Sequence, residues 1–84
     1  MKTVLVVARE RHIRRLIEVN LQRAGYSVSQ LDFDKAIPSR LDQENPELLF
    51  LPPELLPSPL WSRHSTIEIG RGDFQLWRKH DTQP

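Results

Sequence analysis

The chain opens with a short, continuous apolar run and then changes to a helical period. Residues 4–7 (VLVV) are all aliphatic, which is typical of a central parallel strand covered on both faces. From Glu10 to Ala24 the apolar residues recur at spacings of three and four, and this period predicts an amphipathic helix. Its apolar stripe consists of Ile13, Leu16, Ile17, Leu21 and Ala24. Gly25 then lies where a left-handed helix cap is expected.

Two further strands and a short helix are predicted downstream. Residues 26–31 alternate weakly between apolar and polar, as in a partly exposed edge strand. Pro38 suits the first turn of a short helix that runs to Gln43. Residues 48–51 (LLFL) form a second fully apolar strand. The order strand-helix-strand-helix-strand predicts the first half of a doubly wound, three-layer α/β fold with helices on the faces of the sheet.

The pattern changes after Leu51. Residues 52–59 contain four prolines, which predicts an extended segment rather than a helix. Residues 66–69 and 74–77 alternate on either side of a glycine-containing stretch, which predicts a β-hairpin. We therefore divide the chain into residues 1–57 and a C-terminal extension, residues 58–84. The extension is expected to pack either on the same domain or on a partner subunit.

Composition limits the classes of function that need to be considered. The chain of 84 residues has a net charge of +1, so its overall charge gives no general argument for binding nucleic acid. The absence of cysteine excludes disulfides and thiolate metal sites. No apolar run approaches the roughly 20 residues that a membrane-spanning helix needs, and the first apolar stretch is too short for a signal peptide. These features predict a cytoplasmic protein.

The first three-fifths of the chain resemble a known family. Residues 1–51 are similar to the N-terminal part of the receiver domain of bacterial two-component response regulators, through the stretches KTVLVV, ERHIRRLIEVNLQRAGYSV and NPELLFL. The resemblance implies a truncated flavodoxin-like β-α-β-α-β fold with parallel strand order 2-1-3, to which the hairpin is added. In such receivers an acidic pair after the first strand holds Mg²⁺, and an aspartate after the third strand accepts a phosphoryl group.

The residues that would carry receiver chemistry are replaced in this chain. The acidic pair aligns with Ala8 and Arg9, and the phosphoacceptor aligns with Pro52. None of these side chains supplies the carboxylate oxygens that Mg²⁺ needs or a nucleophilic oxygen for phosphoryl transfer. We therefore expect a degenerate pseudo-receiver that is not an enzyme, holds no metal or cofactor, and acts in signalling as a protein-protein interaction module.

The arginines around the first helix allow other interpretations. Arg9 either holds an anion or forms a salt bridge with Glu10 or Glu54. Arg14 is expected to pair with Glu18 at the i,i+4 spacing of a helix. A rival function is a small nucleic-acid- or anion-binding protein. Its contacts would come from Arg9, Arg11, Arg14 and Arg15.

The second apolar strand raises the question of what covers it. Residues 48–51 are too apolar to form an open sheet edge, so either the hairpin folds beside them or another chain does. We expect a homodimer joined through the C-terminal part, with another signalling protein as a further candidate partner. The candidate interface residues are Leu49, Leu51, Trp61, Phe74 and Trp77.

Overall fold

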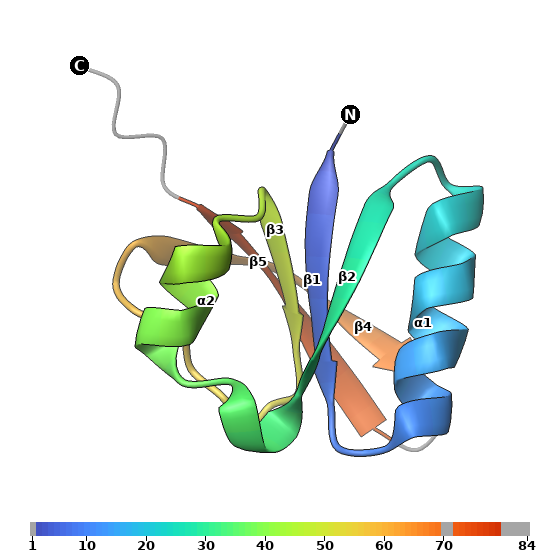
Figure 1. Ribbon diagram of the computed structural model, residues 1–84, viewed down its shortest axis with the longest axis horizontal. Coiled ribbons are helices and arrows are strands. Elements are labelled where there is room, and N and C mark those ends of the chain that lie inside the picture. Colours follow the sequence, from blue (N-terminus) through green and yellow to red (C-terminus); the bar gives the residue numbers. More distant parts are fainter. Residues whose placement is uncertain (1, 70–71, 80–84) are drawn as a thin grey trace.

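The computed structural model describes residues 2–69 and 72–79, which form a mixed α/β domain (Figure 1). The described residues form five strands, two α-helices and a short 3₁₀ helix. In order, they are β1 (Thr3–Ala8), α1 (Arg11–Arg23), β2 (Ser27–Asp32), η1 (Phe33–Lys35), α2 (Pro38–Glu44), β3 (Leu48–Leu51), β4 (Trp61–Ile69) and β5 (Gly72–Lys79). Every strand and helix expected from the sequence is present, and residues 52–60 form no helix.

All five strands belong to one sheet with the order β2-β1-β3-β5-β4. The strand β1 pairs in parallel with both β2 and β3, which confirms the expected order 2-1-3. The strand β5 pairs antiparallel with β3, and β4 pairs antiparallel with β5. The hairpin therefore continues the sheet of residues 1–57 within the same chain. The hairpin's loop, residues 70–71, lies outside the described residues.

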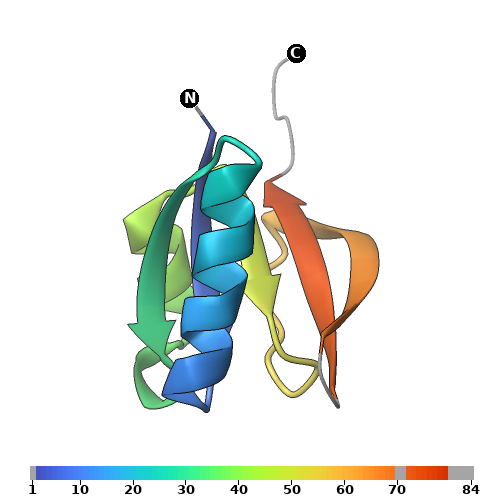
Figure 2. The ribbon, with the colours of Figure 1, turned by 90° about the vertical axis from the view of Figure 1, so that its right-hand side faces the viewer.

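The two helices cover opposite faces of the sheet, so the fold has three layers (Figures 1 and 2). On one face, Ile17 of α1 packs against alternate residues of β1 and against Phe50 and Phe74. On the other face, Leu41 of α2 packs with the remaining residues of β1 and β3 and with Trp61. Because both faces of β1 and β3 are buried, their sequences are continuous apolar runs rather than alternating ones.

The ends of the helices follow local sequence signals. Gly25 follows α1 with a φ of +96°, a backbone conformation that favours glycine, as the sequence predicted. Asn45 ends α2 with a φ of +49°, the second residue type that tolerates this region. Two positions of the predicted apolar stripe, Leu16 and Ala24, are exposed. Leu16 is 48% exposed, because α1 faces the sheet through Ile13, Ile17 and Leu21 instead.

The pairing of β5 with β3 places most of the expected interface residues inside the sheet and core of the single chain. The edge of β3 opposite β1 is occupied by β5 of the same chain, so it needs no second subunit. Leu49, Leu51, Trp61 and Phe74 are at most 7% exposed within the single chain. Trp77 is half-buried and packs against the core that contains Leu49 and Trp61. These side chains form the domain's own core because the hairpin brings them onto the sheet.

The two α-helices are short. The longer helix, α1, has 13 residues. Within residues 2–69 and 72–79, no helix is long and apolar enough to cross a membrane.

Candidate functional site

The candidate site lies where β1 and β3 end and the chain turns into the next segments. Parallel strands place their carboxyl ends at one edge of a sheet, which is where open α/β sheets carry their sites. Ala8 ends β1 and is buried, and Pro52 follows β3 and is also buried. Arg9 lies between β1 and α1, and its side chain is 64% exposed. The three positions at which the resemblance places the acids of a receiver therefore come together, but none presents an acid.

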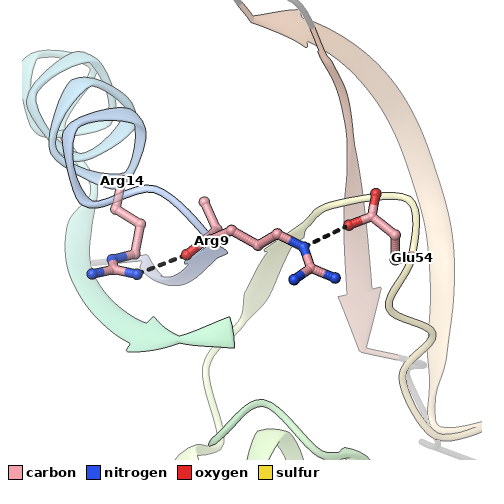
Figure 3. A network of polar contacts seen from close by, with 4 residues as sticks. Arg9, Arg14 and Glu54 are labelled. Carbon is pink, nitrogen blue, oxygen red and sulfur yellow. Dashed lines mark hydrogen bonds and ion pairs between the residues drawn. The ribbon is translucent and has the colours of Figure 1, made fainter. Parts of the chain in front are cut away.

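Arg14 is the buried cation of this junction. Its side chain is only 11% exposed, and its Nη1 atom donates a hydrogen bond to the carbonyl oxygen of Ala8 at 2.7 Å (Figure 3). Its Nη2 atom lies 3.2 Å from Oδ1 of Asp32, at the end of β2. The guanidinium thus joins the end of β1 to the end of β2, and its burial is compensated by a hydrogen bond and an opposite charge.

The structure overturns two expectations for Arg14. It does not pair with Glu18; within the described residues the carboxylate partner of Arg14 is Asp32, and Glu18 lies 3.8 Å from Arg15. Arg14 is also buried rather than free for nucleic acid or another anion. A sequence signal for this exists, because Arg14 lies three residues before Ile17 and seven before Leu21 and so shares their inward-facing side of α1.

Arg9 makes its contacts on the exposed side of the junction. Its Nε atom lies 3.6 Å from Oε2 of Glu54, which confirms the ion pair expected as one alternative for this residue (Figure 3). Its guanidinium carbon also lies 3.8 Å from the centroid of the Phe33 ring, a cation–π arrangement. Both charged side chains are more than half exposed, so the ion pair alone contributes little stability. Its effect is to tie the start of α1 to the segment after β3.

The carboxylates near the junction each lie close to a basic side chain. Glu10 lies 3.0 Å from His12, Asp32 lies 3.2 Å from Arg14, and Glu54 lies 3.6 Å from Arg9. No group of three or more histidine, aspartate or glutamate side chains in the described part of the chain could hold a metal ion. The arrangement neutralises charge and fixes the backbone, and it brings no nucleophile together with a metal-binding acid.

The other two arginines of the predicted anion-binding set face solvent at a different place. Arg11 and Arg15 line an open depression of about 570 Å³ together with His12 and Gln30. Arg15 approaches Glu18 at 3.8 Å, while Arg11 makes no ion pair within the described residues. The four arginines therefore do not form one patch, since Arg9 and Arg14 are engaged at the junction. We call the group of Arg11, His12, Arg15 and Gln30 the basic depression.

A second polar anchor was not foreseen from the sequence. Oδ1 of Asp42 on α2 accepts hydrogen bonds from the Ser58 hydroxyl at 3.0 Å and from Nε1 of Trp61 at 2.8 Å. These bonds fix residues 52–60 against α2 and orient the first residue of β4. They join residues that are 16 and 19 positions apart, and no local spacing pattern indicates such a contact.

Comparison of the chain with protein-family models, curated proteins and solved structures found no match. The receiver resemblance consequently rests on the three sequence stretches that carry it. The function has to be argued from the geometry of this junction and of the surface around it.

Arg14 gives the most direct test of how the junction is held. Replacing it with methionine keeps an apolar stem of similar length but removes every donor, which leaves the buried Ala8 carbonyl unsatisfied. We expect Arg14→Met to lower the free energy of unfolding by about 1–3 kcal/mol in urea titrations. The matched change Arg15→Met removes an exposed ion pair on the same helix and should cost at most about 0.5 kcal/mol. Equal losses in the two variants would contradict the role assigned to Arg14.

Proposed function

We propose that this chain is a truncated, flavodoxin-like pseudo-receiver that acts in signalling through protein contacts and does not transfer phosphoryl groups. The observation that carries the proposal is the replacement of the receiver's acids by Ala8, Arg9 and Pro52 at one junction, with two of these residues buried. Phosphoryl transfer in a receiver needs a metal-bound carboxylate and a nucleophilic oxygen beside it, and these three side chains offer neither.

The cations at the junction support this proposal further. A receiver balances the negative charge of its acidic pair with a metal ion, whereas here Arg9 and Arg14 supply positive charge covalently. Asp32 would be the nearest acid for a metal ion at the end of β2, but it is held by Arg14 at 3.2 Å.

The proposed contact surface is the segment between β3 and β4. Leu56 is 68% exposed and Leu60 is 45% exposed, and both belong to residues 52–60, which the Asp42 hydrogen bonds fix in place. Large apolar side chains held at a fixed surface position suit protein contacts better than a mobile loop does. We propose that the partner is a second copy of this chain or another signalling protein, and that contact occurs in the cytoplasm, where receivers operate.

The first prediction of this proposal is inertness toward phosphoryl donors. After incubation with Mg²⁺ and acetyl phosphate, the mass of the intact protein should be unchanged, because no carboxylate lies beside a metal site where it could attack the phosphorus of the donor. A response regulator with an intact acidic pair, treated in the same mixture, should gain one phosphoryl group and serves as the control. A stable phosphoryl adduct on Asp32, Asp34 or Glu54 would contradict the pseudo-receiver proposal.

The second prediction concerns self-association. Sedimentation at micromolar concentrations should show a dimer of the 9.9 kDa chain. The double change Leu56→Lys and Leu60→Lys should dissociate this dimer without lowering the melting temperature, because both side chains are largely exposed within one chain. The control Leu16→Lys, at an equally exposed leucine on α1, should leave the dimer intact. A single 9.9 kDa species that does not change on concentrating would rule the dimer out.

A further inference from the structure

We infer that the basic depression formed by Arg11, His12, Arg15 and Gln30 is a binding site for a phosphate group. It lies between the first turns of α1 and the outer strand β2, which run side by side in Figure 2. Gln30 pairs with Val6 in the sheet, so it shares the face that α1 covers. The inference is independent of the proposed function, since it uses neither Ala8, Arg9 nor Pro52.

Two cations in the depression are available to a ligand. Arg11 and Arg15 are four residues apart on α1, a spacing that places both side chains on the same side of the helix. Arg11 makes no ion pair within residues 2–69 and 72–79, and Arg15 approaches Glu18 only at 3.8 Å, beyond hydrogen-bonding distance. The side chains of both Arg15 and His12 are about three-quarters exposed. Neither guanidinium therefore has to break a strong contact in order to bind an anion.

The depression lies in a segment of the chain that is rich in arginine. Residues 9–18 contain four arginines and two glutamates, so this segment carries a charge of +2 with His12 neutral, although the whole chain carries only +1. Glu10 is engaged by His12 at 3.0 Å, and Asp32 is engaged by Arg14 at 3.2 Å. Arg11 itself has no carboxylate partner within the described residues.

The donor set of the depression suits a phosphate group. A guanidinium presents parallel N–H donors that match two oxygens of one phosphate, and a tetrahedral phosphate has enough oxygens to bridge two such groups. The amide of Gln30 adds an uncharged donor from the strand side. The depression is open, so the remainder of a phosphorylated molecule would extend into solvent. The phosphate could therefore belong to a small molecule or to a polynucleotide backbone.

The test is a titration of the whole protein with inorganic phosphate, followed by amide chemical shifts at constant ionic strength maintained with chloride. We expect saturable shifts concentrated at Arg11, His12, Arg15 and Gln30. The double change Arg11→Gln and Arg15→Gln should weaken binding at least about tenfold, since it removes both bidentate charges. The control Arg40→Gln, at an exposed arginine that pairs with Glu44 on α2, should leave the affinity unchanged.

A second titration with a short single-stranded DNA identifies the source of the phosphate. If the DNA shifts the same residues with a steep dependence on salt, the site serves a nucleic-acid backbone. If only inorganic phosphate binds, the site serves a small phosphorylated molecule; either result supports the inference. It would be overturned by shifts that neither saturate nor concentrate at the depression with both probes, or by an equal loss of affinity in Arg40→Gln.

Discussion

The pairing of β5 with β3 is the constraint on which the rest of the structure depends. The strand β3 is short, apolar on both faces and central in the sheet, so it requires a strand on each edge and a layer on each face. The parallel strand β1 supplies one edge and the C-terminal hairpin supplies the other. This arrangement buries Phe74 and Trp61, and it makes residues 58–79 part of the same domain as the preceding β-α-β-α-β segment.

The position of the candidate site follows from the pairing of the strands in this sheet. Because β1 and β3 run in parallel, Ala8 and Pro52 meet at one edge, beside the start of α1. At this edge the buried Arg14 side chain binds the Ala8 carbonyl and Asp32. The exposed Arg9 side chain contacts Glu54 and Phe33. The junction is therefore a structural joint. Arg11 and Arg15 lie on the neighbouring surface, in the basic depression.

The helices, strands and strand order could be predicted from the sequence more completely than the contacts between side chains. Apolar runs, the helical period and Gly25 depend on neighbouring residues, and the elements and the order 2-1-3 are confirmed. The hairpin's place beside β3 remained open between two alternatives, because pairing of distant strands leaves no local pattern. Leu16 and Arg14 were assigned to the wrong sides of α1 for a related reason. The helix meets a twisted sheet, and a buried guanidinium becomes tolerable only where Asp32 and the Ala8 carbonyl are within reach.

Native-state hydrogen exchange of the intact chain tests the central claim most directly, namely that the hairpin and the parallel strands form one cooperative sheet. Amides of β5 should exchange with the same free energy of opening as those of β1, because β3 cannot remain folded with one edge and part of its core uncovered. If the amides of β5 instead exchange through a separate opening of lower free energy while β1 stays protected, the hairpin is an independent appendage, and this account of the fold is wrong.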